Sequence, residues 1–338
     1  MHVRRMTERR AVAAAPALAW DWSGALLGAV YALPAALIVP IDLSNGLALA
    51  TGVLPAAIVG CAPQRRQRSR VVLLGLLTGI PIVVGSVLAN VPVLAVVAIA
   101  ALAISSALLS TRRVVGRVVM SLSLPMVGVG LSYSDVSKGA ALGGLMVVGS
   151  AYAWLVSLAW PERPAPPGAP LPQLPPRAML GYGIRLALAG ATAASIGFAF
   201  DFEHVGWACT AALLVMRPSA DMQRLRSVGR VVAVTAGALL AVVLRHLTDR
   251  AAIYGLAVVA LVAGASATRG SRWYVTPFFT TFIVLSLLIY SDPPSAQSRF
   301  NERVGETALG VAIAYFFGLL VPAAMERRRR PALGAARP

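Results

Sequence analysis

Long apolar blocks recur along the whole chain, and short polar loops separate them. Several are long enough, or nearly so, to cross a hydrocarbon core about 30 Å thick. These are residues 71–89, 91–109, 139–160, 178–200, 251–267 and 273–290. A bilayer core offers no hydrogen-bond partner to a peptide group, so each block must be a helix that satisfies its own backbone. The pattern therefore predicts an all-α polytopic membrane protein.

The composition and the placement of charge argue against a nucleic-acid-binding protein. Hydrophobic residues make up 58% of the 338 residues and charged residues 13%, against about 25% charged in a typical soluble domain. The net charge of +17 is high, but the basic residues lie in loops between apolar blocks, and no basic segment is interleaved with aromatic residues. We therefore expect the lipid bilayer, and no nucleic acid, as a partner.

Twelve helices fit the pattern when shorter and interrupted blocks are included. They are expected at 23–41, 45–62, 71–89, 91–110, 117–133, 139–160, 179–200, 203–217, 229–246, 251–268, 273–290 and 304–323. With the N-terminus in the cytoplasm, 24 of the 30 Lys and Arg residues fall on the inner side and five on the outer side, and Arg185 lies inside a helix. Positive charge concentrates in cytoplasmic loops. The count predicts a multi-pass protein of the inner or plasma membrane with both termini in the cytoplasm.

A proline-rich stretch divides the expected helices into two groups of six. Such a stretch forms an extended spacer and cannot be a transmembrane helix. The expected parts are a basic cytoplasmic tail at 1–20, a first six-helix half at 21–160, a cytoplasmic linker at 161–178, a second half at 179–324 and a basic cytoplasmic tail at 325–338. Because each half has an even number of helices, the halves share one orientation. They are predicted to be parallel repeats related by a twofold axis along the membrane normal.

The sequence lacks the motifs of common enzymes and metal sites. It contains no HExxH, Walker or GxSxG pattern, so we predict no enzyme activity, no cofactor and no metal. Cys61 and Cys209 lie at or inside apolar blocks and predict no disulfide. The histidines are scattered, and His204 is expected in an exposed loop.

Charged, hydroxyl and proline residues near the expected spans mark a candidate path for a solute. Pro277 and Thr280 lie in the eleventh helix, where a proline frees a backbone carbonyl that hydroxyl groups or a solute can satisfy. Arg185 lies about two turns into the seventh helix. Glu306 lies in the first turns of the twelfth, three residues after Arg303. Charges inside spans are costly and tend to be functional. A tolerated kink, a snorkelling arginine and an interfacial ion pair remain alternatives.

Four motifs in the second half resemble the fusaric acid resistance and aromatic acid exporter family. They are Trp-Ala-Cys-Thr at 207–210, Val-Met-Arg-Pro at 215–218, Arg-Val-Val-Ala-Val-Thr-Ala-Gly at 230–237 and Arg-Val-Gly-Glu-Thr-Ala-Leu-Gly at 303–310. The resemblance covers residues 180–322 and is more distant to the plant aluminium-activated malate transporters. It implies a twelve-helix protein of a bacterial inner membrane that exports weak aromatic acids.

The charged and aromatic residues, taken together with the resemblance, predict roles for individual residues. Arg230, Arg185 and Arg303 are expected to attract or bind a carboxylate, and Trp207 to stack on an aromatic ring. Glu306 is expected to carry a proton if export is coupled to the proton gradient. The full predicted substrate path is Arg230, Arg185, Trp207, Thr210, Arg303, Glu306, Pro277 and Thr280. A passive anion channel and a non-transporting protein of envelope organisation remain alternatives, and a homo-oligomer or a periplasmic adaptor partner is left open.

Overall fold

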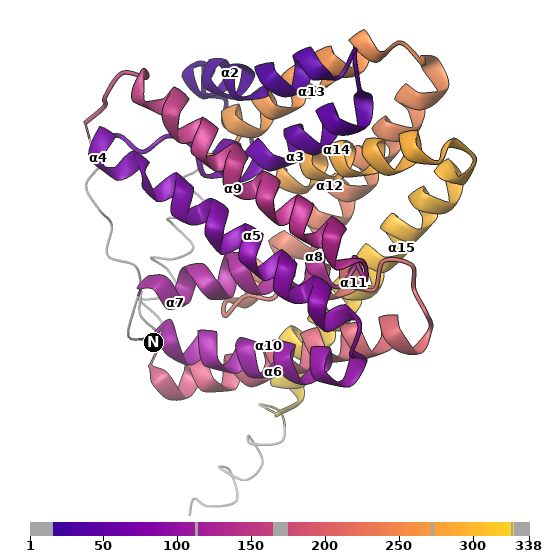
Figure 1. Cartoon of the computed structure of the whole chain (residues 1–338). Coiled ribbons are helices and arrows are strands. Elements are labelled where there is room, and N and C mark those ends of the chain that lie inside the picture. Colours follow the sequence, from indigo (N-terminus) through magenta and orange to yellow (C-terminus); the bar gives the residue numbers. More distant parts are fainter. Residues whose placement is uncertain (1–15, 112–113, 165–174, 272–273, 326, 328–338) are drawn as a thin grey trace, which may run out of the picture. The chain divides into compact units, whose positions relative to one another are not determined.

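The computed structural model describes residues 16–111, 114–164, 175–271, 274–325 and 327 (Figure 1). Every regular element among these residues is helical, which confirms the predicted all-α class. Most of the predicted tails at 1–20 and 325–338, and most of the predicted linker at 161–178, lies outside the described residues.

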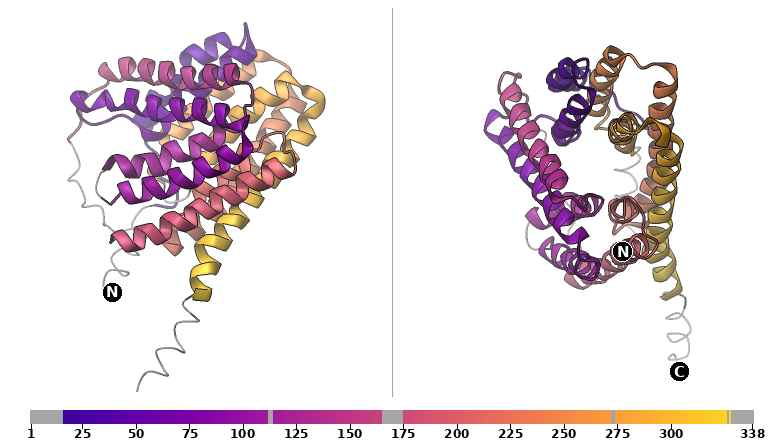
Figure 2. Two further views of the ribbon diagram at one scale, coloured as in Figure 1. Left: turned by 60° about the horizontal axis from the view of Figure 1, so that its bottom comes forward. Right: turned by 45° about the vertical axis from the view of Figure 1, so that its right-hand side comes forward.

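Each of the twelve segments predicted from the sequence contains a helix among the described residues. Those before the linker are α2 (Trp22–Ile38), α3 (Leu43–Val59), the short α4 (Arg65–Arg68), α5 (Arg70–Ala89), α6 (Pro92–Leu109), α7 (Val114–Val118), a π-helical turn (Val119–Ser123), α8 (Leu124–Gly130) and α9 (Val136–Leu158). Those after it are α10 (Pro176–Ala199), α11 (Gly206–Val215), α12 (Ala220–Leu247), α13 (Ala251–Ala267), α14 (Thr276–Ser291), a 3₁₀ turn (Pro293–Ser295) and α15 (Ala296–Tyr315). The chain continues from α15 without a break into a second π-helical turn, Phe316–Leu320 (Figure 2).

Helix length separates these segments into two groups. Six helices in the described part of the chain are long and apolar enough to cross a membrane, namely Arg65–Ala89, Pro92–Leu109, Val136–Leu158, Pro176–Ala199, Ala220–Leu247 and Ala296–Met325. The other apolar helices have 10–17 residues, fewer than the roughly 20 that a straight span uses. The helices are those of a polytopic membrane protein, with six candidate spans by length and composition.

Capping residues account for several helix starts. The carboxylates of Asp21 and Asp42 accept hydrogen bonds from backbone N–H groups in the first turns of α2 and α3, as N-cap residues do. Proline stands in the first turn of α6, α10 and α14, where its missing N–H costs nothing. Pro277 therefore lies in the first turn of α14. The predicted helix start at 273 places Pro277 one turn inside the helix, and that position is wrong.

Two helices begin well before their predicted starts. The sequence pattern predicts helices from 229 and 304, whereas α12 begins at Ala220 and α15 at Ala296. Apolar content identifies a span, but the extra turns are polar, and arginine and glutamine are good helix formers. Arg230 and Glu306 consequently lie about three turns inside their helices. The sequence pattern places Arg230 at the start of its helix and Glu306 in the first turns of its helix, and both positions are wrong.

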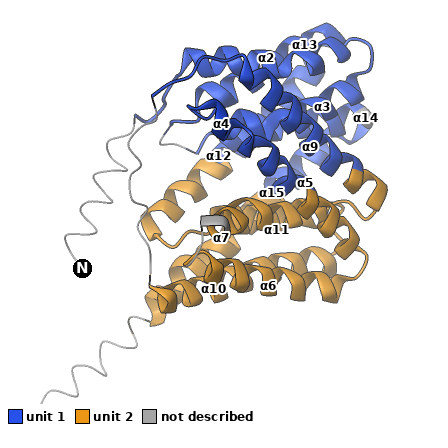
Figure 3. Cartoon of the chain, turned by 60° about the vertical axis from the view of Figure 1, so that its left-hand side comes forward, with its two compact units in different colours: residues 1–79, 141–169, 232–304 blue, residues 80–140, 170–231, 305–338 orange. Residues whose placement is uncertain are grey.

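The chain forms two compact units (Figure 3). Unit 1 comprises residues 1–79, 141–169 and 232–304, and unit 2 comprises residues 80–140, 170–231 and 305–338. Helices α5, α9, α12 and α15 each contain residues of both units. Each unit therefore draws on both sides of the proline-rich linker.

The same combination of helices builds each unit. In unit 1, α2 and α3 pack with α13 and α14, and in unit 2, α10 and α11 pack with α6 and α8. The closest pairs, α2 with α13 and α6 with α10, lie side by side (Figures 1 and 2). Small residues permit these approaches, because a Cβ on Gly28 would strike the Val262 carbonyl and one on Gly183 would press on Ala107.

Candidate functional site

A buried polar face runs along the first three turns of α12 in unit 2. Gln223, Ser227 and Arg230 follow one another at helical spacing and are 0%, 5% and 3% exposed. The Gln223 amide donates a hydrogen bond of 2.7 Å to the carbonyl of Ala314 on α15. A charged side chain buried inside a membrane protein is costly and is therefore a candidate for function, so Arg230 is the first residue of the candidate site.

Helix α15 carries a buried acid. Glu306 is 5% exposed and Thr307 1% exposed. Gly310, one turn later on the same face, lies so close to α11 that an added Cβ would collide with the carbonyl of Ala208. Glu306 therefore projects from the side of α15 that packs inside unit 2, as Arg230 does from α12.

Helix α11 contributes Thr210 and Trp207 to the same unit. The Thr210 hydroxyl donates to the carbonyl of Pro125 at 3.2 Å. The Trp207 ring stacks on the ring of His204, with centroids 4.1 Å apart and an interplanar angle of 16°. His204 is 7% exposed, so the predicted exposed position of this histidine is wrong. The loop before α11 turns His204 onto Trp207, and a linear hydropathy pattern does not reveal that contact.

Arg185 extends from α10 toward the C-terminal end of the last helix. Its Nε donates to the Gly181 carbonyl at 3.1 Å, and its Nη1 lies 3.5 Å from the Gly318 carbonyl. Gly318 belongs to the π-helical turn after α15. The guanidinium is thus placed against protein carbonyls within unit 2.

Five of the eight predicted site residues fall in unit 2, and three fall in unit 1. The unit 1 residues are Arg303, Pro277 and Thr280. The Thr280 hydroxyl returns to its own helix, donating to the Pro277 carbonyl at 3.3 Å. The hydroxyl thus bonds to a carbonyl in the first turn of its own helix.

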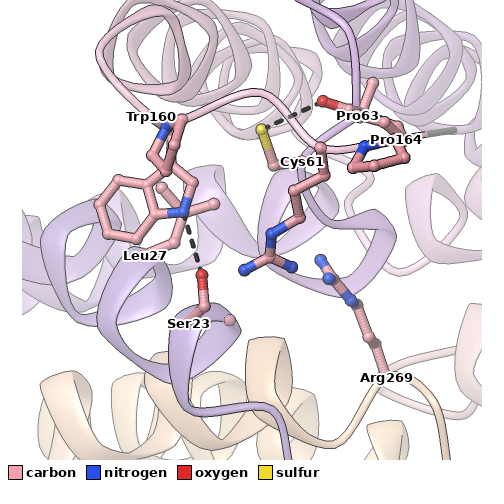
Figure 4. Close-up of a pocket in the computed structure, with 11 residues that line it drawn as sticks. Ser23, Leu27, Cys61, Pro63, Trp160, Pro164 and Arg269 are labelled. Carbon is pink, nitrogen blue, oxygen red and sulfur yellow. Dashed lines mark hydrogen bonds between the residues drawn. The ribbon is translucent and has the colours of Figure 1, made fainter.

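Unit 1 also has a pocket of about 250 Å³ that the sequence does not predict (Figure 4). Its walls come from the start of α2, the loop after α3, the end of α9, the start of the proline-rich linker and the loop after α13. The lining residues are Ser23, Gly24, Leu27, Cys61, Ala62, Pro63, Trp160, Pro161, Arg163, Pro164 and Arg269. The Arg269 side chain reaches into it opposite Trp160 (Figure 4). The pocket therefore has two guanidinium groups and an indole in its lining.

One carboxylate lies between the two arginines of this pocket. Asp21 Oδ2 is 3.1 Å from Arg269 Nη2 and 3.7 Å from Arg163 Nη1. Its Oδ1 accepts a hydrogen bond of 3.1 Å from the backbone of Ser23. Asp21 is thus both the helix cap of α2 and the acid that bridges the two arginines.

The pocket walls are held by further specific contacts. The Trp160 indole N–H donates to the Ser23 hydroxyl at 3.2 Å, which orients the ring. Gly60 ends α3 with φ of 80°, and a Cβ there would collide with the Arg269 guanidinium. Only glycine adopts this conformation at low cost. Burial raises the pKa of the Cys61 thiol above its ordinary value, opposed by the positive charges of three nearby arginines.

Arg68 on α4 is 1% exposed, and its guanidinium forms hydrogen bonds to the backbone of the pocket walls. It donates to backbone carbonyls of the loop after α3 and of the end of α9. Its hydrogen bonds reach Ala62 (3.1 Å), Trp160 (2.7 Å), Pro161 (3.0 Å), Pro63 (3.4 Å) and Ser157. These include carbonyls at a helix C-terminus, which lack partners within the helix. Arg68 therefore joins α4 to the end of α9.

The sequence assigns Arg68, Arg163 and Arg269 to the cytoplasmic side and gives no further role to any of them. They belong to three segments predicted to be cytoplasmic, and charge in such segments is expected for topology alone. Nothing in a single sequence shows that these three loops meet. The one local sequence feature that indicates a specific contact is the pair of charged residues in Pro-Glu-Arg-Pro at 161–164, where the linker begins.

Comparison with known proteins supports the resemblance seen in the second half. A family model described as fusaric acid resistance protein-like matches residues 192–317. The match includes Trp207, Thr210, Arg230 and Glu306, and it begins after Arg185. No curated protein and no solved structure matches the chain. The chain therefore contains a fusaric acid resistance protein-like domain at residues 192–317.

Proposed function

We propose that this protein is an integral membrane transporter that exports organic anions, in particular weak aromatic carboxylic acids. The observation that carries the proposal is the burial of Arg230 about three turns inside α12, within the family-matched segment. An arginine presents a planar fork of donors that matches a carboxylate. Its place on the polar inner face of α12 suits an anion that crosses unit 2.

Glu306 suits the coupling step of such a transporter. It is buried on α15, and ionisable side chains inside membrane proteins commonly form proton relays. In the proposed cycle, Glu306 takes a proton from the outer side and releases it inward as the anion leaves. Arg185 attracts the anion in unit 2, and Arg303 acts in the same way from unit 1. Trp207 contributes an aromatic surface, and Thr210, Pro277 and Thr280 complete the path.

Flux measurements with purified protein in liposomes test this function. Vesicles loaded with labelled benzoate, with membrane potential clamped, should release it faster through the protein when the exterior is acidified. Protein-free vesicles correct for diffusion of the neutral acid. Protein-dependent release that does not respond to the pH gradient would indicate a passive channel. No protein-dependent release would favour a role in envelope organisation.

The helix arrangement supports two six-helix repeats. The first two helices of one half pack with the fourth and fifth of the other in both units. The third and sixth helices of each half contribute residues to both units. A duplicated six-helix segment, with exchange of helices between its copies, accounts for this correspondence. We infer that the copies are parallel, and a homo-oligomer or a periplasmic adaptor stays a prediction.

Reporter fusions test the membrane topology that transport requires. We expect a phosphatase fused after Glu162 to be inactive, because the 24-to-5 division of cations places this residue in the cytoplasm. The same enzyme fused after Asp249, between α12 and α13, should be active outside. A fusion that becomes fluorescent only in the cytoplasm should give the opposite pattern. Activity of the phosphatase after Glu162 would contradict the twelve-span topology.

A further inference from the structure

We infer that the unit 1 pocket is a binding site for a small organic carboxylate, held between Arg163 and Arg269 beside the Trp160 indole. The pocket lies outside the set of residues to which the sequence assigns transport, and its arginines come from loops far apart in the chain. The class of ligand rests on the proposed function, whereas the existence of an anion site rests on the pocket itself.

The position of Asp21 supports the site. One of its carboxylate oxygens lies within 4 Å of both guanidinium groups, at 3.1 and 3.7 Å. The two arginines are therefore already arranged around a carboxylate. The Asp21 and Arg163 side chains are 36% and 47% exposed, and ion pairs that are open to water contribute little. An incoming carboxylate can take the place of Asp21 between the arginines.

The size of the pocket and the residues that line it restrict the ligands that it can bind. Its volume of about 250 Å³ is below the range of about 300–1,000 Å³ that holds drug-sized ligands. An acid with a single ring fits this space better than a larger one. The Trp160 indole and the Leu27 side chain offer apolar contact for the ring, and aromatic pairs prefer offset or edge-to-face packing.

Cys61 provides a local readout for occupancy. It lines the pocket, whereas Cys209, the other cysteine in the sequence, is 0% exposed in unit 2. Benzoate should protect Cys61 of the full-length protein from a maleimide at a pH where part of the thiol is ionised. The neutral analogue benzamide should protect at least tenfold less well. A Cys61→Ser variant identifies the labelled site.

Substitutions at the arginines and at Asp21 decide the mechanism of recognition. Arg163→Gln and Arg269→Gln should each raise the benzoate concentration for half protection at least tenfold. Asp21→Asn should lower it severalfold, because asparagine still caps a helix but carries no charge. Arg66→Gln removes an exposed charge from the same loop region and should change nothing. Melting curves in detergent confirm that each variant is folded.

The results separate this inference from the proposed function and from lipid binding. Arg230→Ala should lose benzoate flux and keep benzoate protection of Cys61. Equal protection in wild type and in folded Arg269→Gln would overturn the site. Protection by phosphatidylglycerol in nanodiscs, without protection by benzoate in phosphatidylcholine nanodiscs, would also overturn it, since the arginines would then hold a lipid phosphate.

Discussion

Replacement of Arg68 by alanine is expected to destabilise the protein far more than replacement of the exposed Arg66 on the same helix. Arg68 is 1% exposed and donates to five backbone carbonyls. Alanine leaves all five carbonyls without this donor. An unsatisfied buried acceptor costs about 1–3 kcal/mol, so a loss of roughly 3 kcal/mol or more is expected when several are left together. The measurement is thermal unfolding of the purified protein in detergent.

A comparison with Arg66→Ala distinguishes the loss of buried hydrogen bonds from the loss of a positive charge. Arg66 lies two residues earlier on α4 and is exposed, so Arg66→Ala removes the same charge without removing a buried donor. Its effect should lie within about 0.5 kcal/mol, as for most surface changes. Arg68→Lys should be intermediate, since one ammonium cannot reach carbonyls on both sides of a planar fork. Equal melting temperatures for Arg68→Ala and Arg66→Ala would show that the hydrogen bonds contribute nothing.

The contrast between Arg66 and Arg68 shows where prediction from sequence ends. Both lie in one basic loop, and the positive-inside pattern places them on the same side of the membrane. Hydropathy likewise locates the helical segments, because a run of apolar residues is a local property of the sequence. The burial of Arg68 depends on the end of α9, some 90 residues later, and a local pattern does not contain that contact.

For the candidate site as well, local motifs could be predicted from the sequence and contacts between distant segments could not. The sequence identifies Arg230, Glu306 and Thr210 through motifs, and all three are buried in unit 2. It misplaces the starts of α12 and α15, because their first turns are polar and hydropathy records only the apolar part. The unit 1 pocket could not be predicted from the sequence, because Asp21, Arg163 and Arg269 belong to three separate loops. Only folding brings them together, beside Gly60, whose lack of a Cβ leaves room for the Arg269 guanidinium.

Replacement of Arg230 by alanine is expected to abolish anion export, with at least a tenfold loss of protein-dependent benzoate flux. Arg230 lies on the face of α12 that also carries Gln223 and Ser227, and it is 3% exposed. An arginine that served topology alone would point to water at the membrane surface. A buried arginine that binds a carboxylate instead offers the anion two parallel N–H donors along its path. Flux into or out of liposomes at matched protein density is the measurement.

Two further variants separate binding from folding in this experiment. Arg230→Lys keeps a positive charge, so it should fold like the wild type and restore part of the flux, because an ammonium lacks the bidentate geometry. Arg224→Ala removes an exposed arginine from the same helix and should leave flux unchanged. If Arg230→Ala unfolds in detergent, Arg230→Lys still gives an answer, since a reduced flux from a variant with the wild-type melting temperature is a loss of function without a loss of folding. Wild-type flux from folded Arg230→Ala or from Arg230→Lys would show that Arg230 does not recognise the anion.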